Sequence, residues 1–166
     1  WGQGSSGVRH KNINKHNIWC FMSESLRFTV EQVVWQEVPG DVSLAFTISG
    51  CPLRCKGCHS SAARNPSAGQ LLTPEYFLAR LNQYQGLISC VLFLGGEWLP
   101  AKLIVLLRIA REQELKTCLY TGFEHVAPNL LPYLTYLKTG PWVAELGGLN
   151  SPNTNQRFID VRTQEN

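Results

Sequence analysis

The hydrophobic positions of this 166-residue chain follow two different periods. Apolar residues alternate with smaller ones in 43–48 and form a continuous run in 88–94, and both patterns predict β-strands, the second covered on both faces. Apolar residues at helical spacing predict one helix that begins at Thr73 and ends near Gly86, and another that begins at Pro100. The chain therefore combines strands and helices.

Further short segments extend this alternation. Four more stretches are rich in strand formers, and short helical turns are expected between 125 and 137, where prolines prevent a long helix. The predicted strands are Arg27–Val38, Thr117–Tyr120, Thr135–Lys138 and Arg157–Val161. A strand and helix alternation with glycine after successive strands predicts an α/β fold with a mostly parallel sheet.

Length and composition predict one domain. The first 21 residues lack an apolar period, so we expect 1–21 to be a disordered leader and 22–166 to be a single domain, with Met22 as a candidate natural start. Cys20, His10 and His16 could bind a metal in this leader, although they lack a tight ligand spacing. The leader is thus a weak candidate for a metal site.

Charge and hydropathy exclude several classes of function. The formal charge is +3, but residues 1–21 contain three basic and no acidic side chains, so the remainder has twelve of each sign. A neutral body is not expected to bind nucleic acid. No apolar run approaches a membrane span or a signal peptide, and clustered cysteines suit a reducing compartment. We therefore expect a cytoplasmic protein without a membrane segment.

Three cysteines spaced CxxxCxxC follow the predicted strand 43–48. Thiolates at Cys51, Cys55 and Cys58 are soft ligands that select iron-sulfur clusters or zinc. A cluster that only carries electrons usually has four cysteine ligands, and a structural zinc is closed by four ligands. Three thiolates would leave one iron of a 4Fe-4S cluster open to a cofactor or substrate.

A second motif, Gly95-Gly96-Glu97, follows the predicted strand 88–94. Loops after neighbouring parallel strands meet at one edge of a sheet, so we expect this turn beside the cysteine loop. Two glycines allow close approach of the backbone to a ligand, and Glu97 can accept a hydrogen bond from an ammonium group.

In these motifs and others, the stretch 37–162 resembles the small activating protein of anaerobic ribonucleotide reductase, a member of the radical S-adenosylmethionine superfamily. The resemblance is carried by the cysteine trio and by further short motifs in the same order. These are Val38-Pro39-Gly40, Ser49-Gly50, Gly95-Gly96-Glu97, Tyr120-Thr121-Gly122-Phe123 and Asn155-Gln156-Arg157.

The resemblance implies a fold, cofactors and partners. It implies a shortened, incomplete (β/α) barrel in which Cys51, Cys55 and Cys58 hold a 4Fe-4S cluster, with S-adenosylmethionine on the fourth iron. Reductive cleavage of that cofactor gives a 5'-deoxyadenosyl radical, which removes hydrogen from a glycine of the reductase. The implied partners are the large subunit of anaerobic ribonucleotide reductase and an electron donor such as flavodoxin or ferredoxin. No catalytic residue beyond the cluster and the cofactor is implied.

The resemblance also assigns cofactor-binding residues. Glycines and the glutamate of the second motif would hold the methionine amino end, and residues around Cys58 would contact adenine. The full set is Gly57, Cys58, His59, Gly95, Gly96, Glu97, Thr121 and Gly122. Three positions depart from the family pattern: Gly57 stands where many members have an aromatic residue, Trp98 where proline is usual, and Thr139 where aspartate is common.

Two alternatives remain open at this point. The chain could activate another glycyl radical enzyme of the formate-lyase type, because Cys58-His59 also resembles those activators. It could instead be a non-catalytic module in which the trio and His59 bind zinc, although all four ligands would then crowd into one loop. Cys90 and Cys118 lie in apolar strands and are expected to be core thiols.

Overall fold

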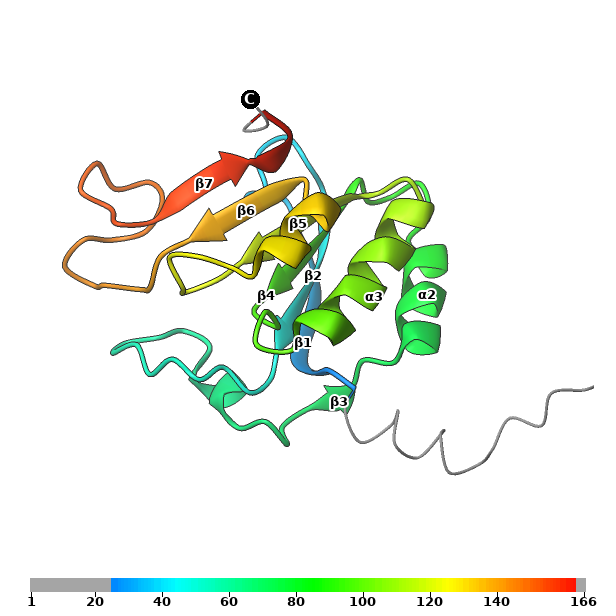
Figure 1. The fold of residues 1–166 in the computed structure, drawn as a ribbon, viewed down its shortest axis with the longest axis horizontal. Helices are drawn as coiled ribbons and strands as arrows, with labels where there is room; N and C mark the ends of the chain where they lie inside the picture. Colours follow the sequence, from blue (N-terminus) through cyan, green and yellow to red (C-terminus); the bar gives the residue numbers. More distant parts are fainter. Residues whose placement is uncertain (1–24, 164–166) are drawn as a thin grey trace, which may run out of the picture.

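The computed structural model describes residues 25–163, which form one open, seven-stranded sheet with helices on one face (Figure 1). The predicted leader 1–21, with Cys20, His10 and His16, and also Met22, lie outside the described residues. The strands run in the order β3-β1-β2-β4-β5-β6-β7. Their bounds are β1 Arg27–Val34, β2 Ser43–Ile48, β3 Gln70–Leu71, β4 Cys90–Leu94, β5 Lys116–Tyr120, β6 Tyr136–Thr139 and β7 Arg157–Asp160.

Strand direction confirms the predicted α/β class. The four central strands β2, β4, β5 and β6 are parallel, whereas β1 pairs antiparallel with β2 and β3, and β7 pairs antiparallel with β6. The sheet is mostly parallel and does not close on itself, as the resemblance to an incomplete barrel implied. Every parallel connection therefore leaves its loop at the same edge of the sheet.

Within residues 25–163, two α-helices and two 3₁₀ helices connect the strands, and a third 3₁₀ helix follows β7. Their bounds are α2 Pro74–Gln83, α3 Pro100–Glu112, η1 Ser61–Arg64, η2 Pro128–Tyr133 and η3 Val161–Thr163. The Thr73 hydroxyl accepts a hydrogen bond from the Tyr76 amide at 3.1 Å, and proline occupies the first turn of α2, as the sequence predicted. In the part of the chain that the structure describes, no helix is both long and apolar enough to cross a bilayer.

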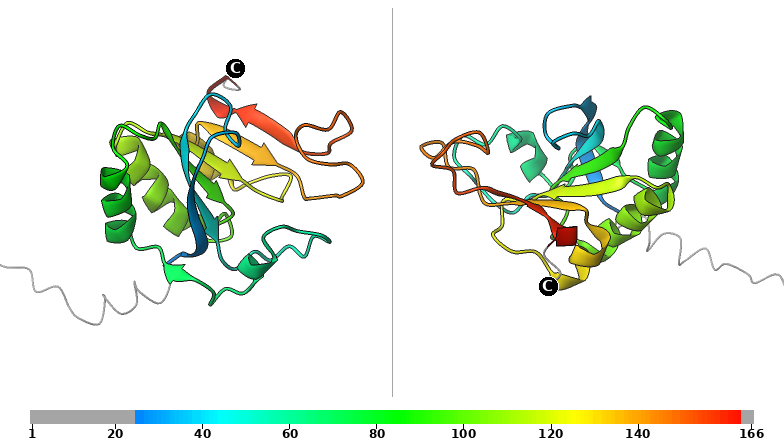
Figure 2. Two further views of the ribbon diagram at one scale, coloured as in Figure 1. Left: turned by 180° about the vertical axis from the view of Figure 1, so that it is seen from behind. Right: turned by 90° about the horizontal axis from the view of Figure 1, so that it is seen from above.

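The helices lie side by side on one face of the sheet and enclose the main core (Figure 2). Phe46, Phe77 and Phe93 are fully buried there, with neighbouring ring centroids 5.6 to 6.1 Å apart. These aromatic contacts fix α2 against β2 and β4, because each ring buries a large apolar area. The central strands are therefore rigid supports for the loops at their ends.

The other face of the sheet is covered by a loop and not by helices. Residues 35–42 fold over it and bury Val38 completely beside Cys90 and Cys118. The hydroxyl of Tyr120 donates a hydrogen bond to the Glu37 carbonyl, which ties this loop to β5. The predicted strand Arg27–Val38 was wrong beyond Val34, because pairing with β2 ends there and the apolar Val38 is used for covering the sheet instead.

The register of the parallel strands aligns the ends of four of them. Thr47 lies opposite Leu94, Leu94 opposite Tyr120, and Tyr120 opposite Lys138. Aligned residues of a parallel sheet point to the same face, so these four side chains form a row at the carboxyl edge. That row underlies the candidate site.

Candidate functional site

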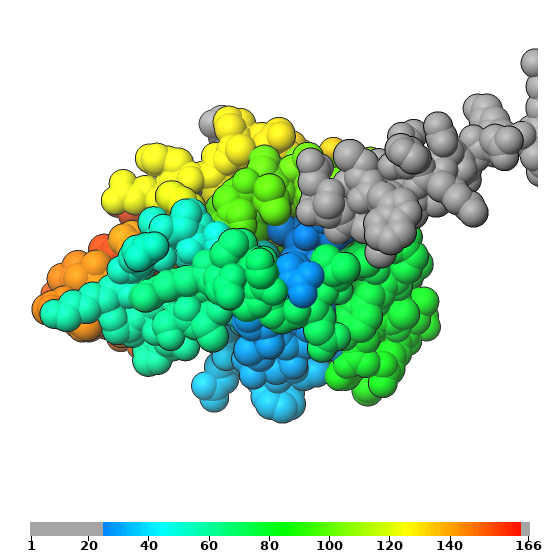
Figure 3. Space-filling view, turned by 90° about the horizontal axis from the view of Figure 1, so that it is seen from below, coloured from blue at the N-terminus to red at the C-terminus, as the bar shows by residue number. Residues whose placement is uncertain are grey.

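Two loops project from the carboxyl edge of the sheet and lie close together (Figure 1). We call residues 50–60, after β2, the cysteine arm and residues 141–156, between β6 and β7, the C-terminal arm. The space-filling view shows both arms at one end of the molecule (Figure 3). The rings of His59 and Trp142 meet edge-on with centroids 5.4 Å apart, so the arms touch through side chains.

The cysteine arm is held by backbone hydrogen bonds at its base. The amides of Gly50 and Cys51 both donate to the Ala63 carbonyl, at 2.7 and 3.2 Å, and Arg64 donates to the Cys55 carbonyl at 2.9 Å. These contacts come from η1, which the sequence did not predict because this stretch has no helical period. The arm is thus shaped mainly by backbone and guanidinium donors, and its thiols make only long contacts: Cys51 Sγ lies 3.9 Å from the Leu53 carbonyl oxygen, and the Ser60 amide donates to Cys58 Sγ at 3.4 Å.

Cys51, Cys55 and Cys58 are free, half-buried thiols that line one cavity of about 170 Å³, here called the inner cavity. Partial burial raises the pKa of Cys51, against a weaker lowering by a hydrogen bond with the Leu53 backbone. Among residues 25–163, no three histidine, cysteine, aspartate or glutamate side chains converge as a site for a single metal ion. The three predicted ligands thus line one cavity, but their side chains do not converge on a single point in it.

The Gly-Gly-Glu turn contributes Gly95 and Glu97 to the wall of the inner cavity. Gly95 and Gly96 have φ angles of 89° and 105°, a region that residues with a Cβ rarely adopt. A Cβ on Gly95 would lie 2.5 Å from the ring of Trp98, which is too close. Trp98, one of the departures from the family pattern, thus packs directly under this turn and lines the cavity.

Glu97 has an unused carboxylate oxygen in this wall. Its Oε1 accepts a hydrogen bond of 2.6 Å from the Thr121 hydroxyl, whereas Oε2 is buried and has no hydrogen-bond partner. Burial raises the pKa of Glu97, and the Thr121 hydrogen bond opposes that effect. A buried carboxylate oxygen without a donor is costly, so this atom fits a cationic ligand group in the cavity.

The other predicted cofactor residues do not all line the inner cavity. Cys58, Thr121 and Gly122 line the inner cavity with Gly95 and Glu97. His59 instead lines a larger neighbouring space, and Gly57 and Gly96 line neither space. Gly122 nevertheless has a clear packing role, because a Cβ there would lie 2.5 Å from Leu53 of the cysteine arm.

The larger space, here called the outer cavity, has a volume of about 790 Å³. It lies among residues 36–39, the two arms and the uncovered face of β5, β6 and β7. The residues that line both cavities are Cys58, Ser60, Tyr120, Lys138, Trp142 and Gln156. The two spaces therefore adjoin at a shared wall.

Five of the six residues on this shared wall had no predicted role in the site, among them Lys138, Trp142 and Gln156. Lys138 belongs to the row at the strand ends, and Trp142 and Gln156 come from the C-terminal arm. The sequence does carry one signal, because Lys138 follows the apolar Leu137 in a strand, and successive strand residues point to opposite faces of the sheet. Thr139, another departure from the family pattern, is buried and lines neither cavity.

Lys138 is the one ammonium group on the shared wall within residues 25–163. Its Nζ lies 5.5 Å from the centre of the Tyr120 ring and 3.4 Å from the Gly140 carbonyl oxygen. Burial lowers the pKa of Lys138, whereas the negative charge of a Cys55 thiolate raises it. The lysine and the cysteine arm are thus close enough to interact electrostatically.

Comparisons with known proteins agree with an iron-sulfur site. A family described as a 4Fe-4S single cluster domain matches residues 38–139, a range that contains the cysteine arm, the Gly-Gly-Glu turn and β6. A search of curated proteins found no match. Among solved structures, the chain is similar to QueE from Escherichia coli, with 15% identity and a TM-score of 0.48. That match covers 64% of this chain and 57% of the QueE chain.

Proposed function

This chain belongs to the family of 4Fe-4S single cluster domains, and we propose that it is a radical S-adenosylmethionine enzyme that activates anaerobic ribonucleotide reductase. In this proposal Cys51, Cys55 and Cys58 ligate three irons of one cluster. Three thiolate ligands would leave one iron of the cluster available to S-adenosylmethionine.

The observation that carries the proposal is the free Oε2 atom of Glu97. It belongs to a residue that lines the same cavity as all three thiols. The α-ammonium group of S-adenosylmethionine offers the donors that this buried carboxylate oxygen needs. A closed zinc site in the cysteine arm would give the Glu97 carboxylate no such partner.

Positive φ angles at the Gly-Gly-Glu turn support the same assignment. Gly95 and Gly96 adopt φ angles that residues with a Cβ rarely adopt, and Trp98 packs against Gly95, so the two glycines allow the tight turn that places Glu97 in the cavity wall. Thr121 holds Glu97 from β5 through a 2.6 Å hydrogen bond, which fixes the carboxylate before a ligand arrives. Because the carboxylate is already held in place, little conformational entropy is lost when the ligand binds.

The reaction requires a dry pocket, and the inner cavity is lined mainly by apolar side chains. Ile48, Leu53, Leu94 and Trp98 contribute to this lining. When bound, the reduced cluster and S-adenosylmethionine supply a 5'-deoxyadenosyl radical that removes hydrogen from the Cα atom of a glycine. The chain's own task is to orient the cofactor and to exclude water from it.

The outer cavity provides a route for the glycine of a protein partner. It adjoins the inner cavity at Tyr120, Lys138 and Trp142 and is large enough for a short polypeptide segment. In this proposal the segment comes from the large subunit of anaerobic ribonucleotide reductase, and a flavodoxin or ferredoxin delivers the electron in the cytoplasm.

Anaerobic reconstitution with iron and sulfide tests the proposal. We expect the absorption of a 4Fe-4S cluster, and release of methionine and 5'-deoxyadenosine when a reductant and S-adenosylmethionine are added. A protein that retains one tightly bound zinc and never cleaves the cofactor would contradict the proposal. A glycyl radical formed on a formate-lyase homologue but not on the reductase would favour the alternative partner.

A further inference from the structure

Lys138 is a half-buried cation that lacks a carboxylate partner among residues 25–163. Two other half-buried cations in this part of the chain have such a partner: Lys116 lies 3.1 Å from Asp41, and Arg80 lies 2.5 Å from Glu31. The contacts of Lys138 are the Gly140 carbonyl, at the limit of a hydrogen bond, and the face of Tyr120. Partial burial of a charge without a counterion costs free energy.

The position of Lys138 limits what its counterion can be. Its side chain lies on the wall between the inner and outer cavities, at the end of the row Thr47, Leu94, Tyr120 and Lys138. Cys58 is part of the same wall, and Cys51 and Cys55 line the inner cavity with it. The carboxylates of Glu97 and Glu37 also line the inner and the outer cavity, respectively, but the charge that acts on Lys138 is that of Cys55 in the cysteine arm.

We propose that Lys138 is the positive charge that compensates the thiolate-bound cluster and raises its reduction potential. This inference rests on the cluster site of the proposed function, and it assigns to Lys138 a positioning and tuning role and no bond to iron. A cluster held by three thiolates is an anion, and reduction adds one more electron to it. A fixed cation in a partly desolvated wall stabilises the reduced form more than the oxidised form.

The chain contains a matched control for this effect. Lys56 follows Cys55 directly in the cysteine arm, but its side chain is exposed to solvent. Water and salt screen an exposed charge strongly, and a half-buried charge much less. Lys56 and Lys138 therefore test whether burial and position, and not formal charge alone, determine the effect on the cluster.

The experiment is a redox titration of the reconstituted cluster, followed by electron paramagnetic resonance, without S-adenosylmethionine. We expect Lys138→Met to shift the reduction potential to a more negative value, Lys138→Arg to restore most of it, and Lys56→Met to shift it much less. Iron and sulfide content report cluster assembly in each variant. If Lys138→Met assembles no cluster, its potential cannot be measured, and the iron content of Lys138→Arg is compared instead. A cluster retained in Lys138→Arg supports the proposal, and loss of the cluster in both variants overturns it.

Two further results would overturn the inference. The first is an unchanged potential in Lys138→Met with weaker binding of S-adenosylmethionine, which would make Lys138 a partner of the cofactor carboxylate. The second is an equal shift in Lys56→Met and Lys138→Met, which would mean a general effect of net charge. Failure of the proposed function itself is a different result, because the unsubstituted protein would then assemble no 4Fe-4S cluster.

Discussion

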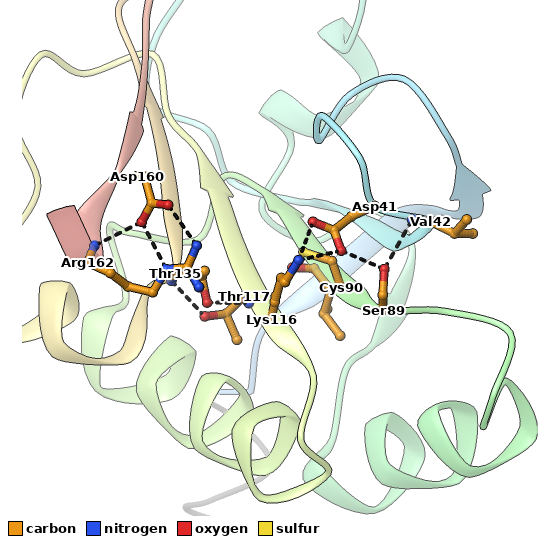
Figure 4. A network of polar contacts seen from close by, with 10 residues as sticks. Asp41, Val42, Ser89, Cys90, Lys116, Thr117, Thr135, Asp160 and Arg162 are labelled. Carbon is orange, nitrogen blue, oxygen red and sulfur yellow. Dashed lines mark hydrogen bonds and ion pairs between the residues drawn. The ribbon is translucent and has the colours of Figure 1, made fainter.

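The described residues contain two sets of cysteines in opposite surroundings. Cys51, Cys55 and Cys58 lie on a loop beyond the end of β2 and face a cavity, whereas Cys90 and Cys118 lie inside β4 and β5 and are completely buried. Cys90 adjoins a polar network in which the Asp41 carboxylate accepts hydrogen bonds from Ser89 and Lys116 (Figure 4). That network lies at the amino edge of the sheet, away from both arms.

The difference between the two sets determines which thiols can bind a metal. A metal ligand must be a thiolate, and burial disfavours the charged form. Burial raises the pKa of Cys90 to about 12 and raises that of Cys118 as well. The strand thiols are therefore apolar packing groups, and the thiols of the cysteine arm are the candidate ligands, although all belong to one residue type.

Substitution of one cysteine from each set gives the largest expected contrast. Cys55→Ala removes one of three ligands, so we expect loss of the reconstituted cluster, measured as iron and sulfide per protein and as visible absorption. Cys90→Ala removes the same group from a buried strand position and should retain the full iron content. Unchanged iron in Cys55→Ala would contradict the ligand assignment.

Glu97→Gln tests the carboxyl edge of the sheet without removing a ligand of the cluster. The amide can still accept the Thr121 hydrogen bond but loses the charge that attracts an ammonium group. A charge-assisted hydrogen bond is worth about 1.5–3 kcal/mol, so affinity for S-adenosylmethionine should fall roughly 10- to 100-fold. Titration calorimetry measures this loss, and the exposed Glu124→Gln is the control.

The affinity for S-adenosylmethionine should also depend on pH through Glu97. Because burial raises the pKa of Glu97, its carboxyl group takes up a proton at a higher pH than an ordinary glutamate does. Protonation removes the charge that binds the ammonium group, so affinity should fall as the pH falls through that raised pKa. Affinity of Glu97→Gln should be flat over the same range, and a parallel decline in both proteins would exclude Glu97 as the titrating group.

At the amino edge, Asp41→Asn should reduce stability and leave cluster content unchanged. Asp41 is buried and lies 3.1 Å from Lys116, whose side chain is 42% exposed and therefore partly screened by water. After that discount the expected loss is about 1–2 kcal/mol in the free energy of unfolding. Urea denaturation measures it, and a loss of iron in this variant would contradict the separation of the two regions.

The ion pair also has a defined pH window. Asp41 raises the pKa of Lys116, mainly through the hydrogen bond between them, so its stabilisation is complete below the ordinary lysine pKa and declines as pH rises through the raised value. The stability difference between wild type and Asp41→Asn should thus be constant from neutral pH to about pH 9 and shrink at higher pH. A difference that shrinks near neutral pH would exclude Lys116 as its source.

Cys90→Ala is expected to have the smallest effect. Removal of one buried sulfur leaves a small cavity, so the free energy of unfolding should fall by about 1 kcal/mol. A larger loss together with lower iron content would show that the strand thiols and the cysteine arm are not independent.

Much of the site could be predicted because its residues are short motifs at strand ends. The cysteine trio and Gly95-Gly96-Glu97 follow β2 and β4, and parallel pairing of those strands puts both motifs on one cavity. Lys138 was missed because its role depends on the register of β5 with β6, which no local pattern specifies. Val38 was misassigned because an apolar residue in a covering loop has the same local pattern as one in a strand.

The contacts of the C-terminal arm also could not be predicted from sequence patterns. Its contribution depends on Trp142 meeting His59, and on Gly140, where a Cβ would lie 2.9 Å from the Asn155 carbonyl oxygen. These contacts join residues distant in the chain without a repeated motif. Long-range packing of irregular loops is therefore the part that required a structure.

Electron paramagnetic resonance of the partner protein tests the central claim most directly. The reconstituted chain, a reductant and S-adenosylmethionine are mixed with the large subunit of anaerobic ribonucleotide reductase under anaerobic conditions, with Cys55→Ala as the control. The account predicts a glycyl radical signal on the reductase that the control lacks. No glycyl radical on the reductase, from a protein that holds its cluster and cleaves S-adenosylmethionine, would contradict the proposed activation.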